Sequence, residues 1–206
     1  MLNNKIKYLL SSIIVFLLIV GLAYTPYTDY ILDRSSNTYY ATPVYGYKPL
    51  DYSLTFYGLK EMGGDNNGNS IIVNMANGLV DWYTDSREIP WCSLYMNYIY
   101  SSCGYEYSGS LLARSWLTVG DTISYKDVMP GDVVILWRGS KTSTKGHVGQ
   151  FIRFNEKDKT VGLLGGNQGN KVGINFYPSH RILGIRRIKK SVSIRNELFT
   201  LDLKNI

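Results

Sequence analysis

The chain has 206 residues, a formal charge of +6 and 45% hydrophobic residues, which is enough for one folded domain with a substantial core. Its positive residues are spread out, apart from one short run at 186–190. A nucleic-acid-binding face needs a denser basic stripe, so we expect no nucleic-acid partner. The mild positive charge instead favours contact with anionic envelope polymers and lipids.

The N-terminus resembles a targeting segment. Lys5 and Lys7 precede an apolar run at residues 8–24 that carries no charge. Its length lies between the core of a signal peptide and a full transmembrane helix. Residues 1–23 are therefore either a signal peptide cleaved after Ala23, or part of a retained membrane anchor with its positive end inside. The alternative is a helix buried in the core of the domain. Either of the first two interpretations predicts an extracytoplasmic protein, in the periplasm or cell envelope, that is secreted or membrane-anchored.

Three further regions follow the targeting segment. Residues 24–50 are rich in tyrosine and proline and lack a helical period, which is typical of an extended stalk. Residues 51–190 are predicted to form the folded domain, and residues 191–206 form a tail of mixed pattern. Helical patterns occur at 51–62, from a cap at Asn69 or Ser70 to Leu79, from Pro90 to Gly104, and from Ser110 to Gly120.

The second half of the domain has the pattern of strands. Apolar or alternating segments lie at 132–137, 147–154, 160–164, 172–177 and 182–187, and turn residues separate them. Helices followed by strands predict an α+β domain, with the N-terminal helices packed on an antiparallel sheet of about five strands.

Cys92 and His147 are the candidate catalytic pair. Cys92 follows Pro90-Trp91 at a predicted helix start, where the positive end of the helix dipole favours a thiolate. A histidine on a strand against that thiol would supply the base of a cysteine nucleophile. The alternative is a buried core cysteine with an unrelated surface histidine, since free cysteine is commonly buried.

The second cysteine, Cys103, is expected to pack in the core. On one helix it would lie about 16 Å from Cys92, which is too far for a disulfide, whose Cα atoms lie within about 7 Å. A zinc site that used both cysteines with His147 and His180 would lack a recognisable ligand spacing. We therefore expect neither a metal nor a cofactor.

The third polar residue of the site is predicted from strand register. If residues 155–159 form a hairpin loop, Phe154 faces Thr160 and His147 lies opposite Asn167 on the same face of the sheet. An asparagine there could orient the imidazole. One residue more or less in the loop would break this pairing, and the alternative is that Asn167 is simply a turn residue.

Five segments carry a family resemblance. They are Pro90-Trp91-Cys92-Ser93, Gly109-Ser110-Leu111-Leu112-Ala113-Arg114-Ser115-Trp116, Pro130-Gly131-Asp132, Gly146-His147-Val148-Gly149 and Gly165-Gly166-Asn167-Gln168. Together they resemble the NlpC-type and CHAP papain-like cell-wall cysteine hydrolases over roughly residues 55–188. The Ala-Arg-Ser-Trp and Gly-Gly-Asn-Gln motifs resemble those of a small bacterial and phage subgroup.

The resemblance implies a papain-like peptidoglycan hydrolase that cleaves an amide bond of the peptide stem. It would be an endopeptidase or an N-acetylmuramoyl-L-alanine amidase. Cys92 would be the nucleophile, His147 the base and Asn167 the third residue, a position where other members often carry histidine or glutamate. The backbone N–H of Ser93 would be the first oxyanion donor. The residues expected to line the substrate groove are Trp91, Trp116 and Gln168, and either tryptophan could instead belong to the core.

Two other functions remain open at this point. The chain could be an inactive wall-binding module that kept the fold, or an acyltransferase that acts on a lipid or a small amide. The expected partners are peptidoglycan and, if residues 8–24 are not cleaved, the membrane.

Overall fold

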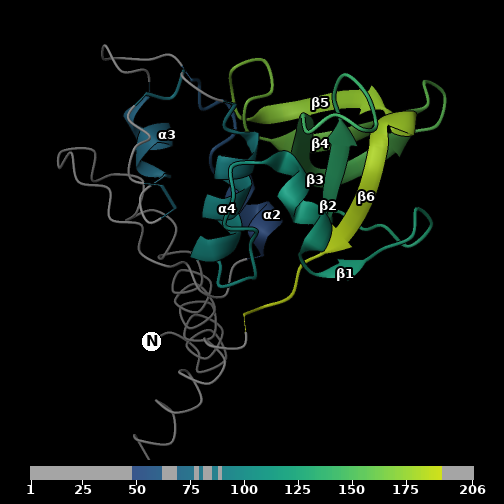
Figure 1. Ribbon diagram of the computed structural model, residues 1–206, viewed down its shortest axis with the longest axis horizontal. Coiled ribbons are helices and arrows are strands. Elements are labelled where there is room, and N and C mark those ends of the chain that lie inside the picture. The colour runs from purple at the N-terminus through teal and green to yellow at the C-terminus, as the bar shows by residue number, and fades with distance from the viewer. Residues whose placement is uncertain (1–47, 62–68, 77–78, 81–84, 88–89, 192–206) are drawn as a thin grey trace, which may run out of the picture. The chain divides into compact units, whose positions relative to one another are not determined.

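The computed structural model describes residues 48–61, 69–76, 79–80, 85–87 and 90–191 (Figure 1). No helix among these residues is long and apolar enough to cross a membrane.

The segments expected at the two ends of the chain fall mostly outside the described part. The predicted signal or anchor segment, nearly all of the stalk and the tail beyond Ser191 lie outside it. The first described helix starts at Pro49, two residues before the boundary predicted for the domain.

A six-stranded sheet occupies the second half of the domain (Figure 1). Its strands are β1 (Asp121–Thr122), β2 (Val133–Trp137), β3 (Gly146–Asn155), β4 (Thr160–Gly165), β5 (Gly173–Pro178) and β6 (Ile182–Arg187). They lie in the order β1-β6-β2-β3-β4-β5, and every neighbouring pair is antiparallel. The predicted α+β class is confirmed. The five predicted strands are present, and the sheet has a sixth, the two-residue edge strand β1.

The helices are shorter than the sequence predicted. They are α2 (Pro49–Leu54), α3 (Ser70–Asn74) and α4 (Cys92–Ser102), with the 3₁₀ helices η1 (Ala113–Thr118) and η2 (Ser179–Arg181). Asn69 caps α3 as predicted, because its side chain accepts a hydrogen bond from the N–H of Ile71 at 2.9 Å. Pro90 is not the first residue of α4, since Trp91 occupies the N-cap position.

The helix predicted from Ser110 to Gly120 is the 3₁₀ helix η1. Side chains within this segment favour the tighter turn. The Ser115 hydroxyl donates to the carbonyl of Leu112 at 2.7 Å, and the Thr118 hydroxyl donates to that of Ser115 at 2.9 Å. Each bond spans three residues, the spacing of a 3₁₀ helix, and hydroxyls bonded to the nearby backbone compete with α-helical bonding.

Apolar residues cover both faces of the sheet. In Figure 1, α2 and α4 lie to one side of the strands. Residues of α4 pack with alternate residues of the central strands, including Val133, Ile135 and Val148. The residues between these point to the other face, where a smaller cluster forms from Val134, Leu136, Phe151, Val161, Leu163 and Ile185. This alternation decides on which face each site residue of β3 lies.

The turn between β3 and β4 is one residue shorter than predicted. Asn155 pairs with Thr160 and Phe154 pairs with Val161, so the loop holds four residues and the predicted Phe154–Thr160 pair is wrong. The register then shifts between Phe151 and Arg153, as in a β-bulge. Beyond the shift, Gln150 pairs with Leu164. The predicted five-residue loop would have given the same pair. β4 ends at Gly165, so the ladder stops before it reaches Asn167.

The Pro130-Gly131-Asp132 motif joins β2 to β6. The buried carboxylate of Asp132 accepts hydrogen bonds from Nε and Nη2 of Arg187 at 2.9 and 2.7 Å. It also accepts the N–H of Met129 at 2.8 Å. A buried charge must be paired in this way to be tolerated, so the motif has a structural role in this chain.

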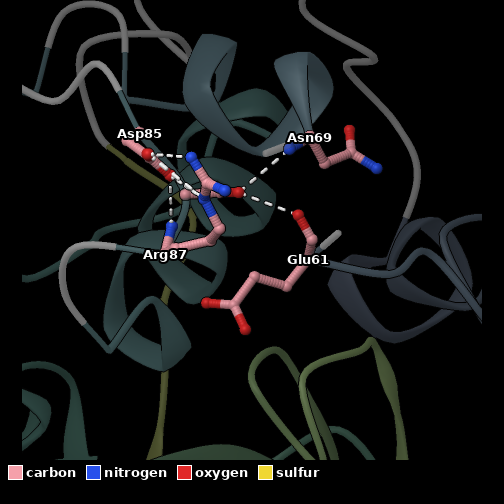
Figure 2. A network of polar contacts seen from close by, with 5 residues as sticks. Glu61, Asn69, Asp85 and Arg87 are labelled. Carbon is pink, nitrogen blue, oxygen red and sulfur yellow. Dashed lines mark hydrogen bonds and ion pairs between the residues drawn. The ribbon is translucent and has the colours of Figure 1, made fainter. Parts of the chain in front are cut away.

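A second polar network ties together the first described segments (Figure 2). The hydroxyl of Ser86 donates to the carbonyl of Glu61 at 2.9 Å and accepts the N–H of Asn69 at 3.0 Å. Beside it, Arg87 forms an ion pair with Asp85 at 2.6 Å. The start of α3 is thereby fixed to the segment that follows α2.

Candidate active site

Cys92 is the first residue of α4, and its side chain is 3% exposed. Backbone hydrogen bonds from Val148 of β3 and from Ser93 reach the sulfur and favour its charged form. Toward His147, the pairing of β3 with β4 ends at Gln150–Leu164. The N–H of Val148 therefore makes no hydrogen bond to β4. The thiol therefore lies at the sheet edge where β4 has ended, beside the residue that follows His147.

The environment of Cys92 nevertheless disfavours the thiolate. Burial raises the pKa of the Cys92 thiol above its ordinary value, and it outweighs the backbone hydrogen bonds and the charge of Arg138. Removing a charged group from water costs more than these partners return. The prediction that the helix terminus holds Cys92 as a thiolate is wrong, because the resting form is the neutral thiol.

His147 lies on β3, opposite Leu136 of β2, and is 4% exposed. Its side chain shares a sheet face with Leu136, whereas the next residue, Val148, packs on the side of α4. The imidazole packs against the ring of Tyr177 from β5, with 5.2 Å between ring centroids. Nε2 of His147 lies 3.3 Å from the Tyr177 hydroxyl.

A buried glutamine fixes the direction of the hydrogen bonds at this histidine. The side-chain amide nitrogen of Gln168 donates to the carbonyls of Leu163, Gly165 and Gly173, at 2.9, 3.3 and 2.6 Å. Its carbonyl oxygen must therefore face the opposite way, where it accepts the Tyr177 hydroxyl at 2.6 Å.

The hydrogen-bond network assigns the tautomer of His147. Tyr177 has a single hydroxyl proton, which it donates to Gln168, so it can only accept from the imidazole. Nε2 of His147 is then the protonated nitrogen, as deduced from its partners. Nδ1 keeps its lone pair, which is the form that a general base requires.

His147 is also neutral in its resting form. Burial, together with the positive charges of Arg138 and Arg181, lowers the pKa of His147 to about 4, although a hydrogen bond with Gln168 opposes the shift. The site at neutral pH therefore pairs an uncharged thiol with an uncharged imidazole.

Asn167 does not take the orienting position that strand register predicted. Its backbone has a positive φ of 55° in the turn after β4, and among the described residues its side chain makes no hydrogen bond. The next residue, Gln168, and Tyr177 hold the imidazole instead. The alternative interpretation, that Asn167 is a turn residue, describes the structure better.

The two tryptophans expected in the groove belong to the core. Trp91 and Trp116 are both 0% exposed, and Gln168 is 1% exposed, so none of the three is open to a ligand in this structure. Trp116 supports the start of α4, since its indole N–H donates to the Ser93 hydroxyl at 3.0 Å. That hydroxyl in turn donates to the carbonyl of Ser110 at 2.7 Å.

Gly166 allows the turn that carries Gln168 to approach α4 closely. A Cβ atom at this position would lie 2.5 Å from the Trp91 ring and 2.7 Å from Cβ of Tyr95. Only glycine fits such an approach. In the Gly-Gly-Asn-Gln motif, the second glycine therefore allows the close approach to α4, and the glutamine contacts Tyr177.

Three residues near the pair were not identified from the sequence: Tyr177, Arg138 and Arg181. Tyr177 sits on a strand whose register could not be deduced, and the two arginines looked like ordinary surface charges. One signal was available for the arginines, because neither residues 133–155, which include Arg138, nor residues 159–191, which include Arg181, contain an aspartate or glutamate. Among the described residues, no group of three histidine, cysteine, aspartate or glutamate side chains is arranged to hold a metal.

Comparison with protein-family models and with curated proteins finds no match. Among solved structures, the fold is similar to a Staphylococcus aureus protein described as similar to lipoprotein, NLP/P60 family. The two chains are 15% identical and superpose with a TM-score of 0.44. The likeness covers 79% of this chain and 47% of the other, so this chain spans about half the length of that protein.

Proposed function

We propose that this chain is an extracytoplasmic cysteine hydrolase that cleaves an amide bond in the peptide stem of peptidoglycan. The proposal rests on two observations: the hydrogen-bonded series from Gln168 through Tyr177 to His147 leaves the lone pair on Nδ1, and the residue next to His147, Val148, donates its backbone N–H to the sulfur of Cys92. A base with a fixed tautomer next to a helix-start thiol is what nucleophilic amide hydrolysis requires. The substrate class rests on the sequence motifs.

The proposed reaction starts from the neutral pair. Nδ1 of His147 takes the proton of the Cys92 thiol as the sulfur forms a bond to the amide carbon, and the carbonyl electrons move to its oxygen. In this proposal the backbone N–H of Ser93 stabilises that negative charge. The carbon–nitrogen bond then breaks, and the proton on Nδ1 passes to the departing amine.

Hydrolysis of the thioester completes the cycle. Nδ1 of His147 takes a proton from water as the water oxygen attacks the thioester carbon. The carbon–sulfur bond then breaks, the sulfur recovers the proton, and the product leaves with a free carboxyl group. Nε2 keeps its proton throughout, because Tyr177 accepts from it and cannot donate to it.

Digestion of purified cell wall tests the proposal. The wild-type chain should release stem fragments whose new ends identify the cleaved amide by mass spectrometry. Cys92→Ala should abolish release. The matched control is Cys103→Ala, which removes the other buried thiol and should keep activity while costing about 1 kcal/mol of stability.

Two results would contradict this assignment. Intact wall after treatment with folded wild-type protein would favour a binding module. If the Cys92→Ala variant were active and a folded Cys103→Ala variant were inactive, the assignment of Cys92 as the nucleophile would be wrong.

A further inference from the structure

Arg138 is the first residue of the loop that connects β2 to β3, at the same end of the hairpin as His147. Its backbone N–H donates to the carbonyl of Lys145 at 3.3 Å, which extends the ladder one step beyond the Trp137–Gly146 pair. It therefore shares a sheet face with Leu136 and with His147 opposite it. Arg138 is exposed, and its charge acts on Cys92, His147 and Tyr177.

Arg181 provides a second cation on the same side. Its Nε and Nη2 donate to the carbonyl of Trp137 at 3.0 and 2.8 Å. The guanidinium lies over the rings of Trp137 and Tyr177, with 5.5 and 5.9 Å to their centroids. It is half-buried and held in place, and its remaining N–H groups keep their hydrogen-bonding capacity.

Neither arginine has an acidic partner among the described residues. The ion pairs there are Arg87–Asp85, Arg187–Asp132 and Lys189–Asp121. Residues 133–155 and 159–191 contain no aspartate or glutamate. The acids between them, Glu156 and Asp158, lie in the turn at the end of β3 remote from His147. Two unmatched cations therefore face a resting pair that carries no charge.

We propose that Arg138, with Arg181 beside it, binds a free carboxylate of the substrate close to the amide that is cleaved. A guanidinium matches a carboxylate through two parallel hydrogen bonds, and the side chain of Arg138 donates to no other group in the part of the chain that the structure describes. The inference rests on the proposed function, since it defines the substrate of the same site. It selects stem peptides in which the residue next to the scissile bond carries a free acid rather than an amide.

Binding to the inactive Cys92→Ala chain tests this without turnover. The probes are synthetic stem peptides in which each free carboxylate is converted in turn to a carboxamide, with affinity measured by calorimetry. We expect one of these changes to weaken binding by about tenfold or more. In the Cys92→Ala background, Arg138→Gln should remove that difference and leave the affinity for the carboxamide peptide unchanged.

A matched control separates recognition from general attraction. Lys141→Gln removes one positive charge from the same hairpin loop and should keep the preference for the acid. Arg138→Lys should restore part of it. The inference is overturned if no carboxamide change weakens binding, or if Arg138→Gln lowers affinity for both peptides equally. If no stem peptide binds, the inference fails, whereas the proposed function fails only if the wild-type chain also leaves purified wall intact.

Discussion

At the scale of single residues, a buried amide decides which nitrogen of the candidate base carries the proton. Three backbone carbonyls accept from the amide nitrogen of Gln168 and so fix the orientation of the amide, with its oxygen toward Tyr177. Tyr177 passes this constraint on to His147. Partners of this kind orient a histidine and tune its basicity, and here they leave Nδ1 as the basic nitrogen.

Tyr177→Phe should lower kcat by about tenfold, because it removes the hydroxyl that accepts from Nε2 of His147, a loss of about 1–2 kcal/mol. His147→Ala should be nearly as damaging as Cys92→Ala, since base and nucleophile act as one unit. Rates of wall hydrolysis by folded variants provide the measurement. The control is Asn167→Gly, which tolerates the positive φ and should retain activity. Wild-type rates for Tyr177→Phe would exclude its orienting role.

The sequence allowed the candidate pair to be found, but not its surroundings. Cys92 and His147 stand out because helix-start and strand patterns flank them and because cysteine and histidine are rare in this chain. The partner of His147 could not be deduced, since it depends on a β-bulge and on where β4 stops. Tyr177 is separated from His147 by two strand pairings, and each would have needed a correct register.

At the scale of elements, η1 contacts both α4 and the loop of the β2–β3 hairpin. Trp116 reaches back to Ser93, while Arg114 donates to the carbonyls of Lys145, Lys141 and Ser140 at 3.2, 2.9 and 3.2 Å. The Ala-Arg-Ser-Trp segment thus contacts both sides of the candidate site. Its arginine fixes the loop that presents Arg138.

Arg114→Ala should loosen this loop. Three carbonyls would lose their charged donor, and each such bond contributes about 1 kcal/mol or more. Amide hydrogen exchange in 139–146 should accelerate, while exchange in α4 should stay close to wild type. Arg153→Ala, which removes an exposed arginine farther along β3, serves as the control. Unchanged exchange in 139–146 would contradict this role of Arg114.

Strands were predicted more accurately than helices. Turn residues and apolar alternation placed each of the five main strands within one residue at either end, because the two-sided burial of a sheet leaves a strong local pattern. The helices ended early because their stability depends on tertiary packing more than on propensity. The two residues of β1 left no such pattern, and they pair only with Arg186 and Arg187 of β6.

At the scale of the whole molecule, the buried histidine links stability to pH. His147 has a pKa of about 4 in the folded chain, against 6.5 for an ordinary histidine. The unfolded chain therefore binds a proton first as the pH falls, so the free energy of unfolding decreases below about pH 6.5 and this contribution is lost near pH 4. The shift corresponds to about 3 kcal/mol.

Urea unfolding at pH 7.5 and at pH 4 would measure this effect. His147→Gln should lose less stability than the wild type between the two values, by about the same 3 kcal/mol. Other titrating groups act equally on both chains and cancel in the comparison. Parallel loss in the two proteins would show that His147 is not held neutral by the fold.

The neutral state of Cys92 also bears on how the protein would survive outside the cell. Oxidation to a sulfenic acid and alkylation both proceed through the thiolate, which the buried resting site disfavours. Iodoacetamide should therefore label Cys92 about tenfold or more slowly than an exposed thiol at pH 7.5, measured in a Cys103→Ala background. Rapid labelling would contradict it. Under the proposed function, the thiol would therefore stay reduced while no substrate is bound.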